Sequence, residues 1–317
     1  MIARSLWIGL VLALLLALPQ FLAEFHLFQL CLIAGTALIV LGLVVVTGLA
    51  GQISLAQSAF AALGAYGATV LAVSAGIPLW AGIVVTALAT GGLGYLLGLM
   101  TLRVAGHYLA LATMAVTAIV QLALIHSDAI TGGAAGLAVP PFGLFGLELT
   151  TGRQLYYVIV PSAALFFLAV ERLLNSHYGR AFAAIRQSET AAEAMGLDVL
   201  RYKAAAFGAS AFLGALGGGL LAPLSSYLDP AQFGITQSVY YLAVAVVGGM
   251  ASPLGAIVGS AVFVLLPDLL QGFQTYLGLV FALLLLGFIV LRPNGLASLS
   301  IVRLRSWPRR AKPELTP

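Results

Sequence analysis

Residues 25–55 read FHLFQLCLIAGTALIVLGLVVVTGLAGQISL, an apolar run interrupted near its end by two glycines and two polar side chains between Thr47 and Leu55. The absence of charge continues well beyond it, because no Asp, Glu, Lys or Arg occurs from Phe25 to Leu102. Helices that cross a membrane need about 20 predominantly apolar residues each. The segment therefore predicts an all-α fold, a polytopic bundle of membrane helices.

Charge is concentrated farther along the chain. Of the 24 charged residues (14 Lys and Arg plus 10 Asp and Glu), nine lie in the 33 residues from Glu171 to Lys203. This segment stands between two long apolar runs and is too polar to cross a bilayer. It is therefore predicted to be a folded loop at one membrane face, where it contacts a partner.

The composition excludes a soluble protein and several kinds of chemistry. Hydrophobic residues make up 62% of the chain, charged residues 8%, and the mean hydropathy is +1.09, values that a soluble core of this size does not reach. Cys31 is the single cysteine and the four histidines are far apart, so neither a disulfide framework nor a metal site is expected. The basic residues adjoin apolar runs, where they set topology, so nucleic acid is not expected as a partner.

Apolar runs that predict about ten membrane helices lie at 6–23, 27–47, 55–75, 79–102, 105–126, 155–174, 204–224, 238–250, 254–270 and 273–291. Alternating sides from a cytoplasmic Arg4 places the basic residues in the cytoplasm with the exception of Arg153, as the positive-inside rule requires. Both termini and the charged loop are then cytoplasmic, in a plasma-membrane protein. The first run is predicted to remain as a helix, and a cleaved signal peptide is the alternative.

Two domains follow from this pattern. Residues 1–291 form the transmembrane domain, which includes the charged loop at 175–203, and residues 292–317 form a basic cytoplasmic tail. The positive charge of the tail favours contact with anionic membrane lipid.

Two helix breaks are predicted within the apolar runs. One lies at Thr47–Leu55, and the other follows the short run at 238–250, which ends in Gly248, Gly249 and Pro253. The surrounding stretches VVVTGLAGQISLAQSAF (44–60) and AVAVVGGMASPLGAIVG (243–259) look alike and suggest a weak internal repeat. Broken helices are typical of transport sites.

Polar side chains inside the runs are the candidates for a transport path. The candidates are Gln52, Ser54, Gln57, Ser58, Thr113, Thr117 and Gln121. The last three follow one another at i, i+4 and i+8, so they share one face of a helix. For Thr113 and Thr117 the preferred interpretation is hydrogen bonding between helices, whereas for Gln52 and Gln57, next to a break, it is the path.

The predicted outer loop at 127–154 contains the glycine-rich run ITGGAAG (130–136). Its bare backbone suits closure over a small ligand or docking of a protein, with Thr131, Gly132 and Gly133 as candidates, and a flexible turn is the alternative.

One short cytoplasmic helix is predicted from Tyr178 to Gly196, a stretch without proline that ends at a glycine. Its apolar residues Ala181, Phe182, Ile185, Ala192 and Met195, with charged residues such as Arg180, Arg186, Glu189 and Glu193, would fit a groove on a partner. An amphipathic helix lying on lipid headgroups is the alternative, against which the mixed charge argues.

Any energy source must come from outside this chain. The spans of the first half carry no charged residue, so a proton relay is hard to build, although a sodium site of carbonyls and hydroxyls stays open. No phosphate-binding G-x-x-x-x-G-K-[ST] sequence occurs. The chain is expected to bind no cofactor, and an ATPase would be a separate polypeptide.

Several blocks together resemble a known family. The stretch AAEAMG (191–196) is similar to the cytoplasmic EAA-type loop of ABC importer permeases, whose helix inserts into the ATPase subunit. The further blocks are GLAGQISLAQSAFAALGAYGA (48–68), GHYLALATMA (106–115), ITGGAAGL (130–137), SYLDPAQF (226–233), VVGGMASPLGAIVGS (246–260) and LRPNGL (291–296). Over nearly its whole length the chain resembles the second permease subunit of high-affinity branched-chain amino acid importers.

The resemblance implies a set of partners and roles. It implies two ABC ATPase subunits that bind the ATP, a homologous second permease and an extracytoplasmic binding protein, in a bacterial inner membrane. ATPase contacts would then fall on Arg180, Arg186, Glu189, Ala191, Ala192, Glu193 and Gly196. The glycine loop at Thr131–Gly133 would be an outer gate or the docking site of the binding protein.

Departures from the family pattern leave alternatives for the substrate. The helix after the YLALAT block has no acidic residue, the outer glycine loop has Ala134 and Ala135 where an Asp is usual, and Thr190 stands where the loop pattern has Glu. An importer of urea or short-chain amides, or a secondary transporter that works alone, therefore stays open. An enzyme is not expected, because the few His and Asp residues do not converge.

Overall fold

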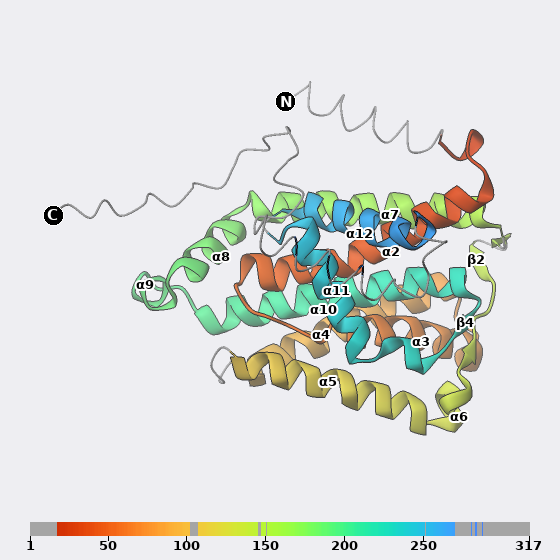
Figure 1. Cartoon of the computed structure of the whole chain (residues 1–317). Coiled ribbons are helices and arrows are strands. Elements are labelled where there is room, and N and C mark those ends of the chain that lie inside the picture. Colours follow the sequence, from red (N-terminus) through yellow and green to blue (C-terminus); the bar gives the residue numbers. More distant parts are fainter. Residues whose placement is uncertain are drawn as a thin grey trace.

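The computed structural model describes residues 18–101, 107–144, 147–149, 151–250 and 252–269, with the single residues 280, 283 and 287. Over these residues the chain is a bundle of long helices with short strands at one end (Figure 1). The predicted helical membrane fold is confirmed. Nearly all of the predicted run at 273–291, most of the run at 6–23 and the tail at 292–317 lie outside the described residues.

Within the described part, six helices are long and apolar enough to cross a membrane. They are α2 (Glu24–Leu43) with its π-helical continuation η2 (Val44–Leu49), α3 (Gln57–Ala75), α4 (Leu79–Thr101), α5 (His107–His126), α7 (Gly152–Leu174) and α10 (Val199–Ser225). Each coincides with one predicted run to within a few residues.

A bent pair of helices gives a seventh candidate span among the described residues. α11 (Ile235–Gly248) and α12 (Pro253–Leu269) meet at an angle of 115° across a short break, with Gly249 in a positive-φ conformation (φ +110°). A Cβ on Gly259 would overlap the Val244 carbonyl oxygen, so the two helices pack closely on each other. The predicted break after residue 248 is confirmed, and the runs at 238–250 and 254–270 are the two arms of this pair.

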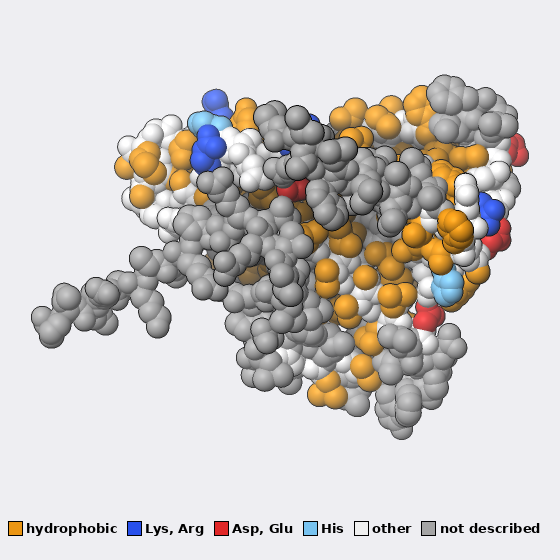
Figure 2. Space-filling view, turned by 90° about the horizontal axis from the view of Figure 1, so that it is seen from above, with side chains coloured by type: hydrophobic (Ala, Val, Ile, Leu, Met, Phe, Trp, Pro, Cys, Tyr) orange, Lys and Arg blue, Asp and Glu red, His pale blue; other side chains and the backbone are white. Residues whose placement is uncertain are grey.

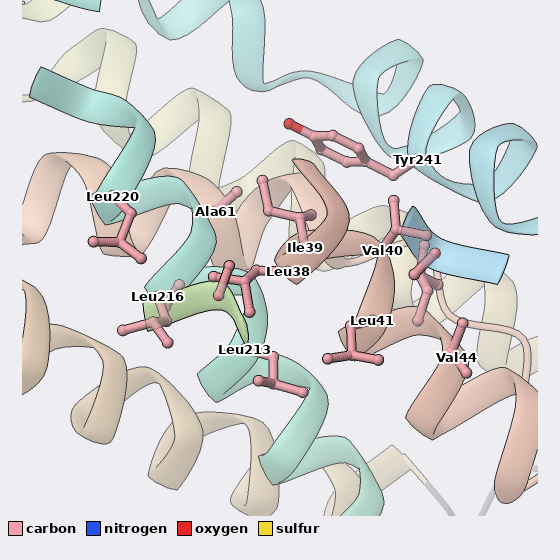
Figure 3. Packing of buried hydrophobic residues seen from close by; sticks show 14 of the residues in the cluster. Leu38, Ile39, Val40, Leu41, Val44, Ala61, Leu213, Leu216, Leu220 and Tyr241 are labelled. Carbon is pink, nitrogen blue, oxygen red and sulfur yellow. The ribbon is translucent and has the colours of Figure 1, made fainter. Parts of the chain in front are cut away.

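The core is built around α2 and α10, of whose apolar windows 72% and 78% is buried, against 22% for α5 and for α7. α10 packs on α2, α3 and α4. Figure 3 shows leucine and valine side chains of α2 and α10 together at this contact. Apolar faces of the peripheral helices are left exposed, as expected for helices that meet lipid.

Glycines set the spacing between α3 and α10. A Cβ on Gly64 would overlap the backbone of Ala215, and a Cβ on Gly218 would overlap the backbone of Ala61. Helices in membranes associate through such close backbone contacts, since lipid tails remove most of the hydrophobic driving force between them.

The short elements lie at the two ends of the bundle. At one end, on the right of Figure 1, β1 pairs with β4 and β2 pairs with β3 in antiparallel order. The short elements are η1 (Leu18–Gln20), α6 (Asp128–Thr131), η3 (Gly133–Ala135), β1 (Leu137–Ala138), β2 (Phe142–Leu144), β3 (Leu147–Leu149), β4 (Tyr227–Leu228) and η4 (Pro230–Phe233). We call this end, with α6 and the strands, the strand end.

The opposite end carries two helices, α8 (His177–Gln187) and α9 (Glu189–Ala194), where the sequence predicted one. The single-helix prediction is wrong because Ser188 is extended (φ −159°, ψ 116°) and caps α9, its hydroxyl accepting a hydrogen bond from the Ala191 amide at 3.2 Å. Serine competes for local backbone hydrogen bonds in this way and favours a helix start over a helix interior.

The surface has the polarity of a membrane protein. In Figure 2, hydrophobic side chains occupy the middle of the visible face, while most of the coloured Lys, Arg and His side chains lie toward its two ends. The exposed large hydrophobic side chains include Leu88 in α4, Ile119 in α5 and Leu165 in α7.

Candidate functional site

The first predicted break is a widened helix followed by an extended stretch. At the end of η2 the Ala50 amide donates to the Val45 carbonyl at 3.4 Å and the Gln52 amide to the Val46 carbonyl at 3.2 Å, so these hydrogen bonds enclose more residues than α-helical ones do. Residues 51–56 that follow are not helical. Wide turns of this kind often occur at functional sites.

Two predicted path residues hold this stretch in place. The Leu55 amide donates to the Thr113 hydroxyl at 2.9 Å, and the Thr117 hydroxyl donates to the Leu55 carbonyl at 2.8 Å. Both threonines are buried in α5 and satisfy backbone groups that the break has freed. The structure places them as hydrogen-bond partners between elements, as the preferred interpretation predicted.

The third member of that helix face lies nearer the strand end. The Gln121 side-chain amide donates to the Pro230 carbonyl in η4 at 3.4 Å. The face of α5 therefore joins two irregular segments, the stretch around Leu55 and the segment at η4.

Gln57 lies between three helices. Its side-chain amide donates to the Ile39 carbonyl of α2 at 2.6 Å, and its carbonyl oxygen accepts from the Ser210 hydroxyl of α10 at 3.1 Å. Gly42 and Gly214 leave the space that this side chain fills. Gln57 is fully buried and does not line the cavity described below, so the structure places it in the packing of α2, α3 and α10.

Replacing Gln57 by the similarly sized Met should lower the thermal stability of the purified protein. Buried acceptors that lose their donor cost about 1–3 kcal/mol, and the Ile39 carbonyl and Ser210 side chain would both lose a partner. The measurement is the unfolding midpoint in mild detergent. Gln187→Met, at an exposed position of α8, is the matched control and should leave the midpoint unchanged.

Three other candidates surround the same region. Gln52 and Ser58 are buried, and the Gln52 Oε1 and Ser58 Oγ atoms make no hydrogen bond in the described part of the chain. The Ser58 amide donates to the Ser238 hydroxyl of α11 at 3.1 Å, and the Ser54 hydroxyl accepts from the Ala56 amide at 3.4 Å. Polar atoms buried without a partner are costly and often mark a functional position.

A cavity of about 360 Å³ lies between α2, α3, the end of α10 and α11. Apolar and small residues form most of its wall, with the polar side chains of Ser225, Gln232, Gln237 and Tyr241 among them. Figure 3 shows the Tyr241 ring beside Ile39, which also lines the cavity. The other lining residues are Ala61, Gly218, Leu221, Ala222, Leu228 and Phe233.

The glycine loop adjoins the wall of this cavity. Leu137 in β1 pairs with Leu228 in β4, a lining residue, and a Cβ on Gly136 would overlap the Leu228 carbonyl oxygen. The Tyr66 hydroxyl donates to that same carbonyl at 2.9 Å. The loop is therefore packed against the strand-end wall of the cavity.

The predicted gate residues themselves are two glycines in left-handed conformations and an anchored threonine. Gly132 and Gly133 have positive φ angles (+73° and +57°), which glycine adopts readily. The Thr131 hydroxyl donates to the Leu124 carbonyl at 2.6 Å, which fixes the loop to the end of α5.

At the opposite end, the candidate coupling residues separate into two groups. Arg180, Arg186, Glu189, Ala191, Glu193 and Gly196 are exposed. Ala192 is fully buried with Ile185 and Val199, and Ala181 and Phe182 are buried as well. The prediction that these apolar side chains face a partner is wrong, because they pack on their own chain; Met195 is exposed.

One ion pair and one aromatic contact fasten the two helices to α10. Lys203 Nζ lies 2.6 Å from Glu189 Oε2, and the Phe182 ring meets the Tyr202 ring edge-on at 5.8 Å between centroids. The exposed surface of α9 and the adjoining turn is mixed, with the charged Glu189 and Glu193 beside Ala191 and Met195.

The cavity residues were missed from the sequence. Gln232 and Gln237 stand in the segment between two apolar runs, which was interpreted as an outer connection, and Tyr241 belongs to the short run at 238–250. Pro230 and the two glutamines within this connection are the signal that could have indicated irregular backbone with polar side chains.

Several long apolar helices, one bent helix pair and a cavity between helices are features of a multi-pass membrane protein. The family model "Branched-chain amino acid transport system / permease component" matches residues 26–290. The chain belongs to this family, whose members are permease components of a larger transport system.

Curated relatives agree with this assignment. The chain is 32% identical over 298 residues to the high-affinity branched-chain amino acid transport system permease protein LivM of Escherichia coli and 31% identical to that of Salmonella typhimurium. Both matches cover 86% of this chain and 70% of the relative. A probable LivM of Methanocaldococcus jannaschii is 24% identical over 184 residues, 56% of this chain and 53% of the relative. No solved structure gives a significant match.

Proposed function

We propose that the chain is the permease subunit of an ATP-driven, binding-protein-dependent importer of branched-chain amino acids in a bacterial inner membrane. The observation that carries the proposal is the placement of a cavity toward the strand end and of an exposed helix pair, α8 and α9, at the other end of one membrane bundle (Figure 1). A permease needs two such parts on opposite sides of the membrane, one that admits the substrate and one that binds the ATPase subunits.

The chemistry of the cavity suits a small amino acid in transit. Its volume of about 360 Å³ falls in the range of small-molecule sites. Leu221, Ile39 and Phe233 offer apolar surface to a branched side chain, and the amides of Gln232 and Gln237 can bond the ammonium and carboxylate. The described lining residues carry no charge, which favours passage over tight binding.

Each soluble partner is proposed to dock at one end of the helix bundle. Two ATPase subunits, which bind the ATP, would dock on the exposed residues around α9 at the cytoplasmic face, and the binding protein on the strand end near Thr131–Gly133. A homologous second permease would cover part of the apolar perimeter, and lipid the rest. The chain itself would be neither an enzyme nor a cofactor-binding protein.

The test is uptake into proteoliposomes that contain the complete complex with internal ATP. Labelled leucine should accumulate only when ATP and the binding protein are both present, and an excess of valine should compete while urea should not. Accumulation without ATP would contradict the proposal in favour of a secondary transporter, and competition by urea alone would assign an amide importer.

Filling the cavity should slow transport without unfolding the protein. Ser225 lies at the exposed end of α10 and lines the cavity, so Trp at this position would occupy it. Because a transport path must stay open to conduct, uptake should fall roughly tenfold or more, with ATPase assembly unchanged. Ser225→Ala, which keeps the space, should transport as the unmodified protein does.

A further inference from the structure

The end of α8 lies against the helix break that follows α2. The Arg186 guanidinium donates a hydrogen bond to the Gly48 carbonyl in η2. On the way its aliphatic part passes over Gly51, where a Cβ would lie 3.5 Å from the Arg186 Cγ. Gly51 has a positive φ (+70°), so the backbone turns directly under the arginine.

Gly48 also touches the second break. A Cβ on Gly48 would overlap the Met250 carbonyl oxygen, and Met250 lies in the turn between α11 and α12. The two breaks that the sequence predicted, 202 residues apart from Gly48 to Met250 (250 − 48), therefore meet at one point. Arg186 attaches the cytoplasmic helices to that point.

The polar groups beside this contact are incompletely satisfied. In the described part of the chain, the Thr47 Oγ1 and Gln52 Oε1 atoms are buried without a hydrogen-bond partner, one on each side of Gly48. A carbonyl in a widened helix lacks the regular amide donor, and a charged donor is a strong substitute. Arg186 thus supplies a charged donor to the joint, and the two unpaired atoms give it spare hydrogen-bonding capacity for a second arrangement.

Other contacts of α8 and α9 lead elsewhere. The Glu189–Lys203 ion pair and the Phe182–Tyr202 contact tie the two helices to the start of α10. A displacement of α9 by a partner therefore reaches α10 through these residues and reaches the two breaks through Arg186.

We infer that Arg186 is a positioning residue that transmits movement of α8 and α9 to the joint between the two helix breaks at Gly48 and Met250. The inference rests on the proposed function, because it requires a motor that moves α9. Loss of Arg186 should leave the ATPase subunits bound and active but disconnect their cycle from the path.

The experiment compares uptake with ATP hydrolysis in the same proteoliposomes of the complete complex. Arg186→Gln should keep the subunit stoichiometry and the rate of ATP hydrolysis near those of the unmodified complex. The uptake per ATP hydrolysed should fall roughly tenfold, which is within the range by which single mutations change the coupling between two sites. Arg186→Lys, which keeps a charged donor, should recover part of the loss. Arg172→Gln, an exposed arginine at the same end of α7, is the matched control and should change neither quantity.

A second readout follows the joint itself. Cys31 is the chain's single cysteine, so Cys31→Ala with Gln52→Cys gives one reporter thiol in a buried position. Its labelling rate should change when ATP and vanadate trap the ATPases, and that change should disappear with Arg186→Gln. The inference is overturned if the change persists in the variant, or if uptake and hydrolysis fall in parallel, since Arg186 would then act in docking alone.

Failure of the proposed function gives a different result. In that case the complex without the Arg186 substitution already shows no ATP-dependent uptake. The labelling rate of its reporter thiol then does not change when nucleotide is added. An Arg186→Gln complex that does not assemble while Arg186→Lys assembles and couples normally would also overturn the inference, because assembly rather than transmission would then require the side chain.

Discussion

Leucine at Gly64 is expected to prevent the bundle from folding. A side chain there meets the backbone of Ala215, and at the reciprocal contact Gly218 already touches the backbone of Ala61. Overpacked side chains can change rotamer, but two helix backbones can only separate, and separation would open the contact along its whole length. We expect a loss of more than about 3 kcal/mol, measured as the yield of monodisperse protein from membranes and the unfolding midpoint of what remains.

The control for this substitution is Gly92→Leu in α4. A Cβ at Gly92 meets nothing within 4 Å, and the residue is exposed. Glycine is about 0.8–1.0 kcal/mol less favourable than alanine in a helix interior, and leucine ranks close to alanine. The variant should therefore accumulate at least as well as the unmodified chain, and equal behaviour of the two leucine variants would show that the α3–α10 contact does not set stability.

Proline at Ala192 is expected to abolish ATP-driven uptake while the membrane bundle stays folded. The Ala192 amide donates to the Ser188 carbonyl at 3.1 Å, in a helix of six residues that has few other hydrogen bonds. Proline removes this bond and its ring clashes with the same carbonyl, at a cost of about 3 kcal/mol or more. α9 would then unfold locally, and the ATPase subunits should no longer copurify with the tagged chain.

Proline at Thr190 provides the control, because this residue lies in the first turn of α9, where amides have no acceptor within the helix. It should retain most of the uptake. The interpretation of α9 as the coupling element is contradicted if Ala192→Pro leaves ATP-driven uptake intact, or if it removes the protein from the membrane altogether.

Much of the fold was predictable because lipid imposes strict rules on a spanning chain. Six apolar runs became six helices, and the breaks at Thr47–Leu55 and after Gly248 appeared where glycine and proline interrupt apolar sequence. The spacing of Thr113 and Thr117 predicted a common face, and the structure adds what that face binds, the backbone of Leu55.

The remaining features depend on contacts between distant segments. The Arg186–Gly48 hydrogen bond joins residues 138 positions apart, and the cavity is lined from four helices and two shorter elements. Gln57 was predicted as a path residue because it follows a break, and nothing in the sequence indicated that Gly42 and Gly214 leave the space into which its side chain packs. Ser188 was not recognised as a helix cap because a serine fits both a helix start and an exposed helix position.

The π-helical turn of η2 has a mechanical consequence. Its hydrogen bonds enclose more residues than α-helical bonds do, so the segment Val44–Leu49 holds surplus backbone in a shortened length. Return to α-helical bonding would advance the chain by about 1.5 Å per residue released and rotate everything beyond it by about 100°. A change from π-helical to α-helical bonding at the end of α2 would therefore both shift and rotate the segment that Arg186 contacts at Gly48.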